Sequence, residues 1–108
     1  MTLQTREQVE LLRDTLSQKF DAKQIFLFGS QANGEAARDS DIDICVVVNL
    51  QNKRKLDLLR EIRKELINRV TSSLDILLYS EEEFFERARL GNTLEHKIMN
   101  EGVRLYEQ

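Results

Sequence analysis

The sequence predicts one α/β (α+β) domain in which helices flank a small mixed β-sheet. Short apolar or β-branched runs alternate with longer segments of helical periodicity, which is the pattern of a sheet covered by helices. The 108 residues suffice for a single domain. Because the chain contains no proline and no low-complexity stretch, we identify no linker and interpret residues 1–108 as one unit.

Composition and charge are those of an ordinary globular chain. Hydrophobic residues make up 41% and charged residues 32%, and the net charge of -3 gives no electrostatic reason to expect nucleic acid as a partner. Cys45, the one cysteine, cannot form an internal disulfide and is expected to be a small buried hydrophobe. Without an apolar run of signal-peptide or membrane-spanning length, the sequence predicts a cytoplasmic protein with no membrane partner.

Helical periodicity predicts helices at residues 5–20, 53–70, 80–89 and 93–100. Thr5 followed by Gln8 forms a capping-box pattern at the start of the first helix. Ser80 followed by Glu83 forms the same pattern at the third. Gly102 fits a cap at the end of the last helix. Residues 30–37 are interpreted as a loop or one short helical piece.

Strands are predicted at residues 25–28, 41–48 and 74–79, with an edge strand in VRLY near the end. The connection between the first two strands is too short for a parallel crossover, so these strands are expected to be antiparallel. The long helix between the second and third strands is a proper crossover, so these strands are expected to be parallel.

This topology brings acidic residues to one edge of the sheet. Asp41 and Asp43 are two residues apart on a predicted strand and should point the same way. Asp75 lies at the start of the neighbouring parallel strand, and the Gly29–Ser30 turn ends the first strand beside them. Carboxylates packed together repel, and Mg²⁺ would relieve that repulsion. Since a Gly-Ser turn offers N–H groups and a hydroxyl to phosphate oxygens, the pattern indicates nucleotide chemistry.

Three other interpretations of these residues are a solvated strand end, a P-loop and a calcium loop, and the sequence favours none of them. An isolated Asp-x-Asp is most often a solvated strand end, but the Gly-Ser turn and the third acid favour a site. The spacing from Gly29 to Gly34 imitates a P-loop, yet Glu35 follows where lysine is required. A calcium loop would need glycine at Ile44 and glutamate at Leu50, so that interpretation also fails.

The residues Gly29-Ser30, ten intervening residues and then Asp41-Ile42-Asp43 resemble the motif of the DNA polymerase β-type nucleotidyltransferase superfamily. With its short length, a third acid in LDILLY and the closing EGVRLYE, the chain looks like a minimal nucleotidyltransferase. It resembles the MntA-like antitoxin group, whose members are encoded beside HEPN-domain toxins. The resemblance covers essentially the whole chain and implies the nucleotidyltransferase fold.

For nucleotide binding, the resemblance implies that Gly29 permits close approach of the backbone and that Ser30 contacts the triphosphate of ATP. Arg38 is retained as a further nucleotide-binding residue. One position departs from the pattern, since Asn33 stands where many relatives carry arginine. The absence of that positive charge is expected to weaken binding of the triphosphate.

For catalysis, the resemblance implies that Asp41 and Asp43 hold Mg²⁺ and that Asp75 completes the second-metal site and helps to activate the attacking hydroxyl. The reaction would be attack on the α-phosphate of ATP with loss of pyrophosphate. The group is thought to transfer AMP onto a tyrosine of the HEPN toxin, as the antitoxin of a type VII-like toxin–antitoxin pair. A hetero-oligomer with that toxin is therefore expected.

Three functions stay open at this point. The first is adenylyl transfer to a protein partner. The second is a non-catalytic antitoxin that neutralises the toxin by binding, and the third is a small-molecule nucleotidyltransferase. The intact Asp41, Asp43 and Asp75 argue against the second. The scarcity of chain beyond the sheet and its covering helices argues against the third.

Overall fold

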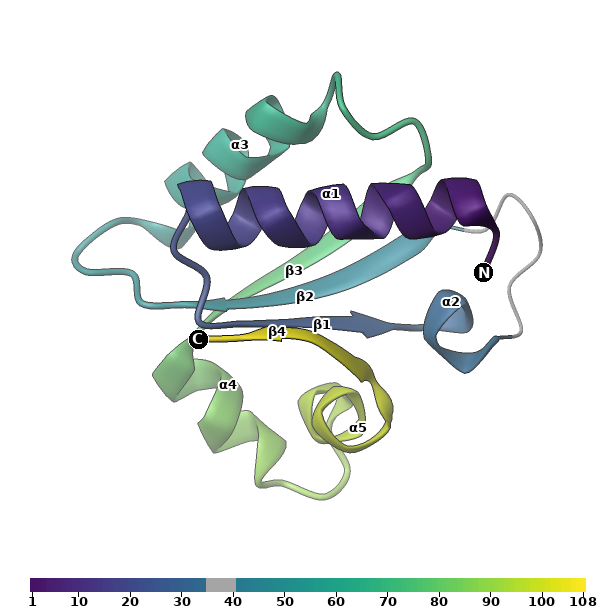
Figure 1. The fold of residues 1–108 in the computed structure, drawn as a ribbon. Helices are drawn as coiled ribbons and strands as arrows, with labels where there is room; N and C mark the ends of the chain where they lie inside the picture. Colours follow the sequence, from purple (N-terminus) through teal and green to yellow (C-terminus); the bar gives the residue numbers. More distant parts are fainter. Residues whose placement is uncertain (35–40) are drawn as a thin grey trace.

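A four-stranded mixed sheet lies between two layers of helices (Figure 1). The computed structural model describes residues 1–34 and 41–108. The strand order is β3-β2-β1-β4. The strands are β1 (Gln24–Phe28), β2 (Ile42–Val48), β3 (Leu74–Ser80) and β4 (Val103–Glu107). The helices are α1 (Leu3–Lys19), α2 (Ser30–Asn33), α3 (Lys55–Leu66), α4 (Glu81–Ala88) and α5 (Leu94–Glu101).

The expected strand pairing is confirmed. β1 is antiparallel to β2, and β2 is parallel to β3 across the α3 crossover. The VRLY segment lies in β4, which pairs antiparallel with β1 at the edge of the sheet. β1 and β2 are therefore central, and their side chains are covered on both faces.

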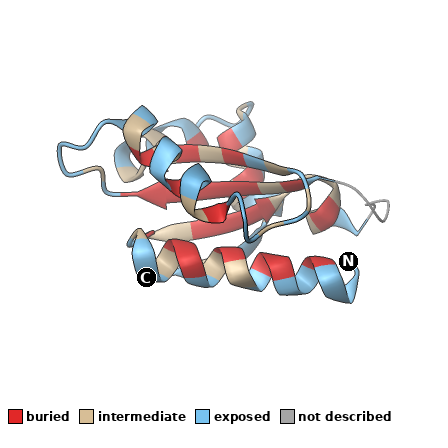
Figure 2. Cartoon of the chain, turned by 90° about the horizontal axis from the view of Figure 1, so that it is seen from above, coloured by how far each residue is buried: buried red, intermediate tan, exposed pale blue. Residues whose placement is uncertain are grey.

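The two faces of the sheet pack against different helices (Figures 1 and 2). α1 and α3 cover one face with an aliphatic cluster that includes Leu12, Leu16, Ile44 and Ile62. α4 and α5 cover the other face with a smaller cluster of Phe26, Cys45, Val47, Phe84, Ala88 and Ile98. The interpretation of Cys45 as a buried hydrophobe is confirmed, because its side chain is fully buried and burial raises the pKa of its thiol to about 12.

Helix α1 begins two residues earlier than the predicted Thr5. The Thr2 hydroxyl accepts a hydrogen bond from the Thr5 N–H at 3.1 Å, so Thr2 is the N-cap. Gln8 is not a capping partner either: its Oε1 accepts from the backbone N–H groups of Thr71 and Ser72 at 2.9 and 3.0 Å. The capping-box prediction was wrong because these long-range hydrogen bonds use the Gln8 side chain.

The other helix boundaries differ by a few residues from those predicted. α3 is shorter than residues 53–70, since Arg54 is extended and the N–H groups of Arg69 and Val70 both donate to Leu66 O in a turn. The Ser80 cap of α4 is confirmed, with its hydroxyl accepting from the Glu83 N–H. Within residues 1–34 and 41–108, no helix combines the length and apolar character that crossing a bilayer requires.

Candidate functional site

Two carboxylates lie opposite each other on β2 and β3. The parallel register pairs Asp43 with Asp75, so both side chains lie on the sheet face that α4 and α5 cover. Asp43 is half-buried and Asp75 is exposed. Partial burial, a hydrogen bond shared with Asp75 and repulsion from Asp75 and Asp41 together raise the pKa of the Asp43 carboxyl. We call Asp43 and Asp75 the acidic pair.

Asp41 lies outside this pair. The prediction that it belongs to the strand was wrong, because β2 begins at Ile42, whose N–H donates to Ser73 O at 2.9 Å. Asp41 is exposed and acts on Asp43 through its charge alone. In the part of the chain that the structure describes, no three His, Cys, Asp or Glu side chains are grouped so as to hold a metal ion.

The Gly29–Ser30 turn lies directly against the acidic pair. Gly29 has φ +75° and ψ −157°, a backbone conformation that is essentially restricted to glycine. A Cβ at this position would overlap Asp43 Oδ2, so the absence of a side chain is what lets the turn approach the carboxylate. Ser30 then begins the single turn of α2, where the N–H groups of Ala32 and Asn33 donate to Gly29 O at 3.1 and 3.2 Å.

The remaining predicted nucleotide-binding residue, Arg38, lies outside the described residues. The structure thus brings together four of the six predicted site residues, namely Gly29, Ser30, Asp43 and Asp75.

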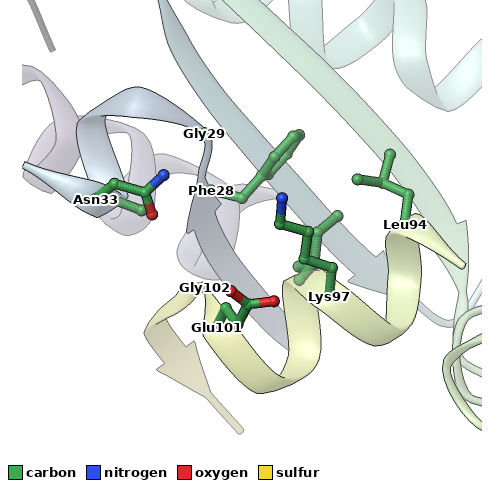
Figure 3. A pocket seen from close by; sticks show the side chains of 9 residues that line it. Phe28, Gly29, Asn33, Leu94, Lys97, Glu101 and Gly102 are labelled. Atoms are coloured by element: carbon green, nitrogen blue, oxygen red, sulfur yellow. The ribbon is translucent and has the colours of Figure 1, made fainter. Parts of the chain in front are cut away.

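A cavity of about 150 Å³ adjoins the turn on the α5 side (Figure 3). It is lined from β1 and α2 by Phe28, Gly29, Ala32 and Asn33, and from α5 and its end by Leu94, Lys97, Ile98, Glu101 and Gly102. Sequence reasoning missed this contribution from α5. The spacing of Leu94, Lys97 and Glu101 along one helical face was the available signal, but it does not reveal which strand the face meets.

The chemistry of the acidic pair fits a divalent cation. Its members are two oxygen donors that repel each other, and a hard cation such as Mg²⁺ prefers carboxylate oxygens. A cation there would remove the repulsion that raises the pKa of Asp43. Asp41, two residues before Asp43, adds negative charge nearby.

Comparison with known proteins gives a family for most of the chain. Residues 9–104 match the family model described as a nucleotidyltransferase domain. Among curated proteins, none matches this sequence. The fold resembles that of a Sulfolobus solfataricus protein described as a nucleotidyltransferase, with a TM-score of 0.67, 17% identity, and coverage of 97% of this chain and 84% of that one.

Two toxin–antitoxin structures are also similar. One, a toxin–antitoxin with AMP-PNP, has a TM-score of 0.50 and 24% identity over 99% of this chain and 75% of that one. The other, a mutant of the toxin–antitoxin MntA-HpeT, has a TM-score of 0.48 and 24% identity over 95% of this chain and 73% of that one. At 24% identity, the likeness to the first of these structures concerns the fold alone.

Proposed function

Since the chain belongs to the nucleotidyltransferase domain family, we propose that it transfers AMP from ATP onto a hydroxyl of a partner protein, a tyrosine of a HEPN-domain toxin. One observation carries the nucleotide part of this proposal. The Gly29 backbone lies against Asp43, which itself lies opposite Asp75, so a phosphate-binding turn adjoins a pair of oxygen ligands. Neither feature is needed to close the hydrophobic core.

The reaction assigns a task to each of these residues. The tyrosine oxygen forms a bond to the α-phosphorus of ATP, and the bond from that phosphorus to the bridging oxygen breaks, so that pyrophosphate leaves. Asp75 accepts the hydroxyl proton, while the Gly29–Ser30 turn orients the phosphate groups. Asp41, Asp43 and Asp75 are the residues that would hold Mg²⁺, which when bound neutralises charge on the attacking and leaving oxygens.

The space near the acidic pair favours a macromolecular acceptor over a small one. α4 and α5 are used to cover the sheet, so neither helix is free to enclose a small acceptor. The similar fold of the toxin–antitoxin with AMP-PNP supports a toxin as the partner and an adenine nucleotide as the substrate.

Labelled ATP tests the proposal directly. The chain is incubated with Mg²⁺, ATP labelled on the α-phosphate and the protein encoded beside it, and label is followed on each protein. We expect label on a tyrosine of the partner, and at least about a 100-fold slower transfer by Asp43→Asn and Asp75→Asn. Asp14→Asn, an exposed position on α1, is the matched control and should transfer at the wild-type rate.

Two outcomes would replace this proposal by another function. Neutralisation of the toxin without label, unchanged in an Asp41→Ala/Asp43→Ala variant, would indicate an antitoxin that acts by binding alone. Label on an added small alcohol or aminoglycoside, with none on protein, would indicate a small-molecule transferase.

A further inference from the structure

We propose that Lys97 of α5 binds the phosphate groups of the nucleotide and supplies positive charge beside the Gly29–Ser30 turn. This inference rests on the proposed function, because it assigns a further binding residue to the same site. Sequence motifs do not point to Lys97, since it lies more than sixty residues after the turn.

Lys97 and the turn line the same cavity. Lys97 reaches the cavity from α5, while Gly29 and Asn33 line it from the opposite wall. Figure 3 shows the Lys97 side chain extending toward Phe28, with Asn33 across the cavity and Glu101 below Lys97 on the same helix. A phosphate held by the turn would therefore lie close to the Lys97 ammonium.

The charge of Lys97 is available for a ligand. Lys19, Lys23, Lys53 and Lys55 form ion pairs with carboxylates. Among the described residues, Lys64 and Lys97 have no such partner, and Lys97 is the one cation that lines this cavity. Because Asp43, Asp75 and Glu101 make the surroundings negative, a phosphate chain would be stabilised by a cation on the α5 side in addition to Mg²⁺, and the neutral Asn33 supplies no such charge.

The position of Lys97 is fixed by contacts on both sides of it in α5. Glu95 Oε1 accepts hydrogen bonds from Tyr79 OH at 3.1 Å and from Arg87 Nε at 2.7 Å, which ties the start of α5 to β3 and α4. At the other end, a Cβ on Gly102 would lie 2.5 Å from Ile98 O and 3.1 Å from Leu27 O. This close approach holds the end of α5 against β1, so Lys97 projects from a supported helix.

The cavity size agrees with a phosphate subsite. Its volume of about 150 Å³ is smaller than a site for a whole nucleotide, and its mouth adjoins the turn that would hold the phosphate chain. The lining combines polar groups of Lys97, Asn33 and Glu101 with apolar side chains of Phe28, Ala32, Leu94 and Ile98.

Calorimetric titration of ATP, inorganic tripolyphosphate and adenosine in Mg²⁺ buffer tests the inference. We expect Lys97→Met to weaken ATP and tripolyphosphate binding about 10- to 100-fold, as a lost charge-assisted hydrogen bond would, and to leave adenosine binding unchanged. Lys97→Arg should retain most of the affinity. Lys64→Met removes an equally unpaired lysine from α3 and should bind all three ligands like the wild type.

A second variant guards against a merely structural effect. Asn33 lines the same cavity, so Asn33→Arg combined with Lys97→Met should recover ATP affinity by at least about tenfold relative to Lys97→Met alone. Circular dichroism checks that every variant is folded. Equal ATP affinity in Lys97→Met and the wild type, or equal losses for ATP and adenosine, would overturn the inference.

The two proposals fail in different ways. If ATP binding depends on Lys97 but no label reaches any partner, the inference stands and the acceptor is wrong. If label reaches the partner at the wild-type rate in Lys97→Met, with unchanged KM for ATP, the proposed function stands and the inference falls. A wild-type chain that binds neither ATP nor tripolyphosphate would overturn both.

Discussion

Two polar clusters lie on the same face of the sheet, and they differ in whether neighbouring groups stabilise or oppose the charge of the carboxylate. The first is the acidic pair, Asp43 and Asp75, whose like charges raise the pKa of Asp43. The second, which we call the Glu95 cluster, consists of Tyr79, Arg87 and Glu95. β3 contributes to both, because Asp75 and Tyr79 are four residues apart and point to the same face.

The Glu95 cluster is arranged to stabilise a charge. Glu95 is only 4% exposed, and burial acts to raise its pKa, but hydrogen bonds from Arg87, its own backbone N–H and Tyr79 outweigh burial and lower it. Its Oε2 is buried without a hydrogen-bond partner among the described residues, so the cluster is not fully satisfied. Among residues 1–34 and 41–108, no cation forms an ion pair with either member of the acidic pair. The comparison teaches that one face of the sheet carries both a compensated charge and an uncompensated acidic pair, and perturbed groups of the second kind are the ones that mark candidate functional sites.

The largest stability effect is expected from breaking the Glu95 cluster. Glu95→Ala removes the acceptor of Tyr79 and Arg87 and leaves space under α5, so we expect a loss of about 2–4 kcal/mol in the free energy of unfolding. Urea denaturation measures it. Glu86→Ala, an exposed position on α4, is the control and should change little. A loss equal to that of the control would mean that Glu95 does not hold the two helices to the sheet.

Gly29 gives a smaller effect that bears on the acidic pair. Gly29→Ala should cost about 1–3 kcal/mol for its backbone conformation alone, and more from the overlap with Asp43. Gly34→Ala is the matched control: its φ is +73°, but nothing lies within 4 Å of its added Cβ, so only about 1 kcal/mol is expected. Thermal denaturation of the two variants compares them. Equal costs would show that the turn does not press against the carboxylate.

The smallest expected effect is a gain. Asp43→Asn removes the repulsion within the acidic pair while leaving the strand intact, so in metal-free buffer it should raise the free energy of unfolding by about 0.2–1 kcal/mol. This combination of higher stability and lost transfer is typical of a site residue. A lower melting temperature of the variant at neutral pH would count against the placement of Asp43.

The pH dependence of that gain has a definite sign. Because the pKa of Asp43 is raised on folding, the folded state binds its proton more tightly than the unfolded state does. The loss of folding free energy caused by the ionised Asp43 is therefore fully present above its folded-state pKa, and it disappears below its unfolded-state pKa. Melting curves at about pH 7.5 and about pH 3.5 should show the advantage of Asp43→Asn at the first and not at the second.

Much of this arrangement followed from local sequence. Alternation and connection length were enough to place Asp43 beside Asp75, because strand direction is constrained by the length of the chain between strands. The start of the second strand does not follow in the same way. The sequence pattern places Asp41 in that strand, whereas β2 begins one residue later, at Ile42. Strand ends depend on which N–H finds a partner across the sheet, here Ser73 O.

The residues that sequence reasoning missed act through tertiary contacts. Glu95 and Lys97 belong to the helix predicted at residues 93–100, but no motif in that segment distinguishes them from its other polar residues. These two residues reach the turn and β3 because α5 packs against the sheet beside the turn. The local sequence does not specify how a helix is placed on a sheet, so it does not reveal these contacts. Gln8 is similar, since its hydrogen bonds reach Thr71 and Ser72 far along the chain.

The alignment of β3 with β2 has a consequence for how such a protein tolerates insertions. A slip of one residue would exchange the two faces of β3, turning Asp75 toward α1 and α3 and bringing an isoleucine or leucine to its place. Both aspartates would still be present, yet they would no longer lie opposite each other on one face of the sheet. A change in length is therefore compatible with this arrangement only where a loop absorbs it before β3 begins to pair with β2.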